Sequence, residues 1–131
     1  MFQNEFRLQN RNSFLIADLN IVDGYKSKES KRENTLTHLF SNFSTDLDFE
    51  NFVDSSINIS FQKVNNDTYL KVFDTNLVNT DLKPDNYDIL TSDVNFNLEN
   101  EKFALSTGFT AYENLNEQNS DRYQYVLPYY D

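Results

Sequence analysis

Residues 88–113 read DILTSDVNFNLENEKFALSTGFTAYE, and the pattern of this segment indicates the fold class of the chain. Apolar and polar residues alternate over 88–99, and the alternation returns over 102–113 after a break at Asn100 and Glu101. A period of two places apolar side chains on one face of a β-strand and polar side chains on the other. Two such runs with a two-residue connection predict an antiparallel hairpin. Its apolar members are Leu90, Val94, Phe96, Leu98, Phe103, Leu105, Phe109 and Ala111.

The same alternation covers most of the chain. It recurs over 2–9, 13–23, 35–49, 55–64 and 122–131. We therefore expect an all-β fold, an antiparallel up-and-down meander of about seven strands in a curved sheet. One run is irregular, because its second face mixes apolar and polar residues, namely Phe14, Ile16, Asp18 and Asn20.

The predicted connections alternate between short and long, at 10–12, 24–34, 50–54, 65–87, 100–101 and 114–121. In a meander, alternate connections lie at the same end of the sheet, so one rim should carry tight turns and the other long polar loops. Outer-membrane barrels of bacteria have this asymmetry. Most runs also reach the length of about 9–11 residues with which a tilted strand crosses the hydrocarbon layer. We therefore expect part of a transmembrane β-barrel, with apolar side chains toward lipid and polar side chains toward a lumen.

The strand count bears on how the chain is organised. Seven is odd and below the roughly eight strands of the smallest single-chain barrels, so residues 1–131 are expected to be a partial outer-membrane β-barrel domain, a fragment. No run approaches the roughly 18 apolar residues of a transmembrane helix. The start, MFQNEFR, lacks the regions of a secretory signal, so any export signal should lie upstream. The expected location is the cell outer membrane.

Composition excludes several classes of protein. An apolar share of 38% is a thin core for a soluble domain, yet 15% aromatic residues argue against disorder. With 21 acidic and 11 basic residues the net charge is −10, which argues against a nucleic-acid binder. The chain has no cysteine, so thiolate metal sites, disulfides and cysteine nucleophiles are excluded.

The one histidine, His38, is the main candidate for catalytic chemistry, and it falls on the polar parity with Asn42 and Ser44. A lipolytic site on a barrel wall would use such residues, but the spacing of a nucleophile elbow is missing. We expect a lumen-facing polar histidine instead. The chain is predicted not to be an enzyme and to have no catalytic residue and no cofactor.

An acidic stretch, Asp46, Asp48, Glu50 and Asp54, is the main candidate for a metal site. It lacks the glycine and the ligand order of a calcium loop, so no metal is predicted. On a strand, the first three of these residues would line one face.

Three further features belong to loops and strand ends. The run Tyr69–Phe73 is expected to extend a strand or to pair locally. Turns are expected at 65–68, at 119–121 and at Pro84 with the two residues after it. The tyrosines of the last run leave two interpretations open, an aromatic belt at a membrane interface or ordinary packing: Tyr123, Tyr125, Tyr129 and Tyr130. The mixed-charge loop 24–34 is expected to be solvated, with contact to anionic lipid head groups as the alternative.

Two segments carry a family resemblance: NDTYLK at 66–71, after a long strand, and DRYQYVLP at 121–128. They resemble the barrel domain of the LptD family of outer-membrane lipopolysaccharide-assembly proteins, and 34–77 is also similar to it. The resemblance implies that the full protein accepts lipopolysaccharide from a periplasmic Lpt bridge and releases it into the outer leaflet. It also implies an LptE-like lipoprotein plug inside the barrel and contact with outer-membrane lipid. No catalytic residue transfers with it.

Two other classes stay open. Another outer-membrane barrel, such as a porin-like or adhesin-type channel, would share this architecture but not the cargo. A soluble antiparallel domain would turn the apolar parity inward around a small apolar ligand. In that case Phe43, Ile59, Phe96 and Phe109 would converge in a sealed interior.

Overall fold

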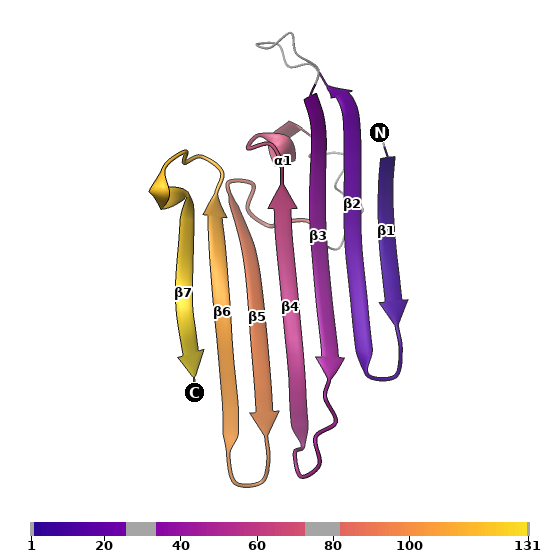
Figure 1. Ribbon diagram of the computed structural model, residues 1–131, viewed down its shortest axis with the longest axis vertical. Helices are drawn as coiled ribbons and strands as arrows, with labels where there is room; N and C mark the ends of the chain where they lie inside the picture. The colour runs from indigo at the N-terminus through magenta and orange to yellow at the C-terminus, as the bar shows by residue number, and fades with distance from the viewer. Residues whose placement is uncertain (1, 26–33, 73–81, 131) are drawn as a thin grey trace.

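The computed structural model describes residues 2–25, 34–72 and 82–130. Within these ranges seven antiparallel strands form one open sheet, in the order of the sequence (Figure 1). The prediction of an all-β up-and-down meander is confirmed. The strands are β1 (Phe2–Gln9), β2 (Ser13–Tyr25), β3 (Asn34–Asp46), β4 (Asp54–Val64), β5 (Ile89–Glu99), β6 (Ala104–Asn114) and β7 (Tyr123–Tyr130), with a short helix α1 (Tyr69–Val72) and a 3-10 turn η2 (Ser120–Arg122).

The strand register separates the two predicted faces. One cross-strand row runs Leu8, Leu15, Phe43, Ile59, Val94 and Phe109, each paired with the next across β1 to β6. A row one residue away runs Ser44, Asn58, Asn95 and Gly108. Because successive side chains of a strand point to opposite faces, these rows lie on opposite sides of the sheet. We call the side of the first row the apolar face and the other side the polar face.

The connections are sorted by length between the two ends of the sheet. Those at 10–12, 47–53 and 100–103 lie together at one end, the short-connection rim (Figure 1). The C-terminal ends of β2, β4 and β6, from which the longer connections begin, lie at the opposite end, the long-connection rim. This is the arrangement predicted from the connection lengths. Residues 26–33, most of the mixed-charge loop, lie outside the described residues.

The hairpin between β5 and β6 differs from the prediction, because its connection has four residues, 100–103, and not two. The side chain of Asn100 is the reason. Its Oδ1 accepts hydrogen bonds from the backbone N–H groups of Lys102 (2.8 Å) and Phe103 (2.9 Å). This side-chain-capped turn takes Lys102 and Phe103 out of the strand, and Ala104 is the first β6 residue to pair, with Glu99.

The acidic stretch also differs from the prediction, because β3 ends at Asp46. Asp48 and Asn51 have φ values of 51° and 71°, which turn the chain out of the strand direction. The side-chain amide of Asn12 donates to the Asp48 carboxylate across the neighbouring connection. Asp48 and Glu50 therefore lie in the 47–53 connection and do not line a strand face.

Most of the buried apolar core lies on the polar face, near the long-connection rim. Tyr69 and Leu70 of α1 pack in one cluster with Ile16, Leu36, Phe40 and Val64 of this face and with Leu82, Leu90 and Leu115, of which Leu90 belongs by its register to the apolar face. The prediction of strand structure at Tyr69–Phe73 is therefore wrong for 69–72, while position 73 lies outside the described residues. The turn at 65–68 is confirmed, because Asn66 Oδ1 accepts hydrogen bonds from the backbone N (3.0 Å) and the hydroxyl (2.8 Å) of Thr68 and so starts α1.

No helix within the described ranges has the length and apolar character that crossing a membrane requires.

Candidate functional site

The apolar face exposes large hydrophobic side chains on most of the strands. In its central row Ile59, Val94 and Phe109 are 38%, 42% and 38% exposed, although each lies between two paired strands. Phe43 and Phe96 are half-buried by their neighbours in the same sheet. The four residues that would fill the interior of a soluble domain, Phe43, Ile59, Phe96 and Phe109, therefore do not converge in a sealed core.

A network of charged side chains lies where the apolar face meets the long-connection rim. The buried carboxylate of Glu113 accepts hydrogen bonds from Lys63 Nζ (2.8 and 2.9 Å) and Arg122 Nη2 (2.7 Å). Arg122 also donates to Asp67 Oδ1 at 2.8 Å. Hydrogen bonding to Asp67 raises the pKa of Arg122, and hydrogen bonding from Arg122 lowers the pKa of Asp67. The network joins β4, β6, η2 and the residues before α1.

Tyrosines of β7 stand beside this network. Tyr123 and Tyr125 are 45% and 60% exposed, which excludes ordinary core packing for both. The Tyr125 ring stacks on Phe109 with centroids 5.9 Å apart, and Lys63 Nζ lies 5.8 Å from the centroid of the Tyr123 ring. The side chains of Tyr129 and Tyr130 lie outside the described part of the structure.

His38 lies on the polar face as predicted, but it is not open to a lumen. His38 and Tyr69 are 1% and 0% exposed. The Tyr69 hydroxyl lies 2.8 Å from His38 Nδ1 and accepts a hydrogen bond from Asn20 Nδ2 at 2.8 Å. His38 Nε2 lies 3.1 Å from Asp18 Oδ2. The prediction of an accessible polar histidine is therefore wrong, because α1 covers this part of the face.

We call Asp18, Asn20, His38 and Tyr69 the buried polar cluster. Sequence reasoning missed three of its members. The mixed face of the 13–23 run was the available signal, because it put Asp18 and Asn20 beside Phe14 and Ile16 without showing what would cover them. Burial raises the pKa of Tyr69 to about 12, so its hydroxyl stays protonated at neutral pH. The cluster is suited to holding α1 in place, and all four of its members are buried among the described residues.

Metal binding finds no support in the geometry. Within the described residues no group of three or more His, Cys, Asp or Glu side chains is placed to hold a metal ion. Of the acidic stretch, Asp46 ends β3, Asp48 and Glu50 lie in the connection, and Asp54 begins β4.

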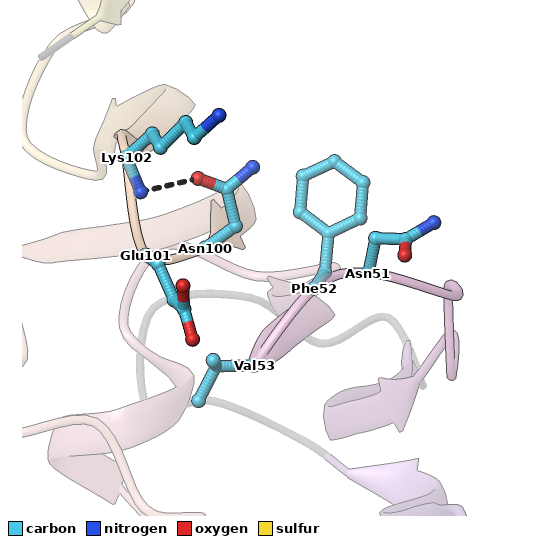
Figure 2. A pocket seen from close by; sticks show the side chains of 6 residues that line it. All are labelled: Asn51, Phe52, Val53, Asn100, Glu101 and Lys102. Atoms are coloured by element: carbon cyan, nitrogen blue, oxygen red, sulfur yellow. Dashed lines mark hydrogen bonds between the residues drawn. The ribbon is translucent and has the colours of Figure 1, made fainter.

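A surface pocket lies at the short-connection rim, between two connections. Figure 2 shows it lined by Asn51, Phe52 and Val53 from one connection and by Asn100, Glu101 and Lys102 from the other. The Phe52 ring lies 6.4 Å from that of Phe49 and 6.0 Å from that of Phe103, in edge-to-face contacts. The pocket contains none of the residues considered from the sequence for catalysis, and its polar groups are those of turns.

No protein-family model, curated protein or solved structure matches this chain.

Proposed function

We propose that this chain is a wall segment of an outer-membrane β-barrel that assembles or translocates lipopolysaccharide into the outer leaflet. One observation carries the barrel part of the proposal, the apolar row across six strands, of which Leu8, Ile59, Val94 and Phe109 are exposed and Leu15 and Phe43 are half-buried. Monomeric soluble proteins seldom expose contiguous apolar patches of more than a few hundred Å². Exposed apolar surface loses roughly 25 cal/mol for each Å² that stays in water. Acyl chains of a bilayer remove this penalty along the whole face.

The opposite face supports the same proposal, because a barrel wall needs a wet side. Below α1 the polar face carries amide, hydroxyl and carboxylate side chains in register, Asn42, Ser60, Asp93 and Thr110 in one row and Ser44, Asn58 and Asn95 in the next. Ser60 donates to Asp93 at 3.1 Å, and Ser106 donates to Asn97 at 2.8 Å. A lumen of an outer-membrane barrel is polar in this way.

Strand length and rim sorting agree with a membrane wall. The central strands β2 to β6 have 11 to 13 residues, enough to cross the hydrocarbon layer at a tilt. The charged network of Lys63, Glu113 and Arg122 then lies at the boundary between lipid and water, where long cationic side chains and tyrosines are favoured.

The lipopolysaccharide part of the proposal depends on the two segments that resemble the LptD family. These segments, 66–71 and 121–128, lie together at the long-connection rim, where Arg122 of the second pairs with Asp67 of the first at 2.8 Å. On the same basis we propose the other partners, a periplasmic Lpt bridge, an LptE-like plug and outer-membrane lipid.

The barrel part is tested with single tryptophans, because the chain has none. Ile59→Trp and Asn58→Trp are neighbours in β4 on opposite faces. Each is made in the intact protein, with any tryptophan elsewhere in it replaced by phenylalanine, and refolded into phospholipid bilayers with brominated acyl chains. Strong quenching of the Ile59→Trp fluorescence and weak quenching of Asn58→Trp are expected. Equal, weak quenching of both, together with a monodisperse detergent-free monomer that melts cooperatively, would show a soluble domain instead.

The cargo is tested separately in the intact protein in its own membrane. A photo-crosslinking amino acid at position 58 faces the proposed lumen, and one at position 59 faces lipid. Capture of lipopolysaccharide at position 58 is expected. Capture only of phospholipid at position 59, with none of lipopolysaccharide at 58, would leave a barrel of another kind, such as a porin-like channel.

A further inference from the structure

The connection after β4 turns back over the sheet. Asn65 makes this turn: its Oδ1 accepts from the backbone N of Thr37 (2.8 Å), and its Nδ2 donates to the carbonyl of Thr35 (2.7 Å). Both partners belong to β3, so the chain is directed along the neighbouring strand and not away from the rim. α1 follows within four residues and reaches β2, two strands from where the connection began.

Three anchors hold α1 on the polar face. Tyr69 contacts Asn20 of β2 and His38 of β3 through its hydroxyl. Ahead of α1, Asp67 accepts hydrogen bonds from Arg122 and from Gln118 Nε2 (2.7 Å). Within α1, Lys71 Nζ lies 2.7 Å from Asp88 Oδ1, just before β5. These contacts join residues 65–72 to β2, to β3, to Arg122 and Gln118 and to the residue before β5.

The surface beneath α1 contains apolar side chains that favour its docking and polar side chains that oppose it. Tyr69 and Leu70 bury apolar area with Ile16, Leu36 and Phe40, which favours docking. The polar side chains there oppose it: within the described residues Asp18 Oδ1 and Asn20 Oδ1 are buried without a protein hydrogen-bond partner, and His38 Nε2 and Asp18 Oδ2 face each other at 3.1 Å away from water. Water would supply these hydrogen bonds if α1 moved away. Docked and undocked positions of α1 are thus closer in free energy than the apolar contacts alone imply.

We infer that α1 is a releasable constriction on the lumen side of the wall, held in place by Tyr69. The inference rests on the proposed function, because only a closed barrel gives the polar face a bore to narrow. With α1 docked, the bore is reduced beside β2 and β3 near the long-connection rim. With α1 released, Asp18, Asn20 and His38 become part of a wet, polar wall.

The test uses thiol accessibility, since the chain has no cysteine of its own. Leu36→Cys places a thiol in the covered cluster, and Asn42→Cys places one on the same face of the same strand beyond α1. In refolded, bilayer-embedded protein a water-soluble maleimide should label position 42 at least about a hundredfold faster than position 36. Adding Tyr69→Phe should raise labelling at position 36 about tenfold or more, because two hydrogen bonds are lost, and leave position 42 unchanged.

Two further variants serve as controls for the labelling experiment. Asn20→Ala removes the hydrogen bond from Asn20 to the Tyr69 hydroxyl and should raise labelling at position 36 by a smaller factor. Tyr125→Phe alters an exposed tyrosine on the apolar face and should have no effect. Single-channel conductance of the intact protein should rise with Tyr69→Phe.

Several outcomes would overturn the inference. One is equal labelling of positions 36 and 42 in the unaltered background, and another is no response at position 36 to either Tyr69→Phe or Asn20→Ala. Unchanged conductance despite faster labelling would show that α1 moves without narrowing a bore. A different result would refute the proposed function: brominated lipid would not quench the fluorescence of Ile59→Trp. That result does not depend on the maleimide labelling.

Discussion

Ile59→Arg tests whether the apolar face meets acyl chains. Ile59 is the central residue of the eleven-residue strand β4 and is 38% exposed. The nearest charge along the strand on the same face is Lys63, four residues away, roughly 13 Å at about 3.3 Å per residue. A tilt of about 40° puts Ile59 about 10 Å deeper in the bilayer than Lys63.

An arginine at such a depth on the lipid-facing side of a barrel destabilises the folded protein, lowering its free energy of unfolding in the bilayer by about 2–4 kcal/mol. The matched control is Asn58→Arg, one residue away on the polar face, where the side chain reaches water and the change should stay within about 0.5 kcal/mol. Phe61→Arg lies on the apolar face closer to Lys63 and should have an intermediate effect, because the penalty decreases toward the interface.

The assay is reversible urea unfolding from phospholipid vesicles, followed by circular dichroism and by heat-dependent mobility on gels. The order of destabilisation should be Ile59→Arg, then Phe61→Arg, then Asn58→Arg. If Ile59→Arg and Asn58→Arg had the same unfolding midpoint, the apolar face would be in contact with water and the reasoning would be refuted. Equal, large losses at positions 59 and 61 would indicate contact with a protein surface, since a protein interior has no depth gradient.

The charged network and the buried tyrosine give three further predictions. Arg122→Ala should lower the free energy of unfolding by about 1–3 kcal/mol, because the buried Glu113 carboxylate loses a donor, and Arg122→Lys should lower it less; urea midpoints measure both. The pKa of Asp67 is lowered in the folded chain, so its stabilisation is present above about pH 4 and is lost as the pH falls through the lowered value. Asp67→Asn should therefore flatten the acid side of the stability curve, measured between about pH 2 and 5. The pKa of Tyr69 is raised to about 12, so stability should fall as the pH rises from about 10 to 12, by on the order of 2–3 kcal/mol; Tyr69→Phe should abolish this fall in alkaline unfolding curves.

Period-two alternation was enough to predict the strands and their order. Each run from 2–9 to 122–131 became a strand, with ends shifted by a few residues at most, because alternation reports the local pleat and a meander needs only neighbouring pairs. The turn at Asn100 was predicted at the right place but two residues too short. Its length depends on one side chain that bonds to the backbone, and periodicity carries no information about such a bond.

The buried polar cluster could not be assembled from periodicity, because it depends on contacts between residues far apart in sequence. Tyr69 joins Asn20 and His38, separated from it by 49 and 31 positions. The alternation showed only that 13–23 had an irregular second face. Local pattern can mark a surface as unusual, but the element that covers it is known only once the chain has folded.

The mixed polar and apolar residues on one face of β2 are explained if this face is covered by α1 in one state and exposed to water in another. A strand facing only water would have no use for Ile16 beside Asp18, and a strand always covered would not retain Asp18 and Asn20 with unsatisfied oxygens. A surface that α1 covers for part of the time needs both: apolar groups that hold the helix and polar groups that water can hydrate once it leaves. The hydrogen bonds of Tyr69 then decide which state prevails. On the inference that α1 is releasable, the mixed pattern in 13–23 marks a surface that is covered for part of the time, and β3 shares this pattern through Leu36 and Phe40 on the same face.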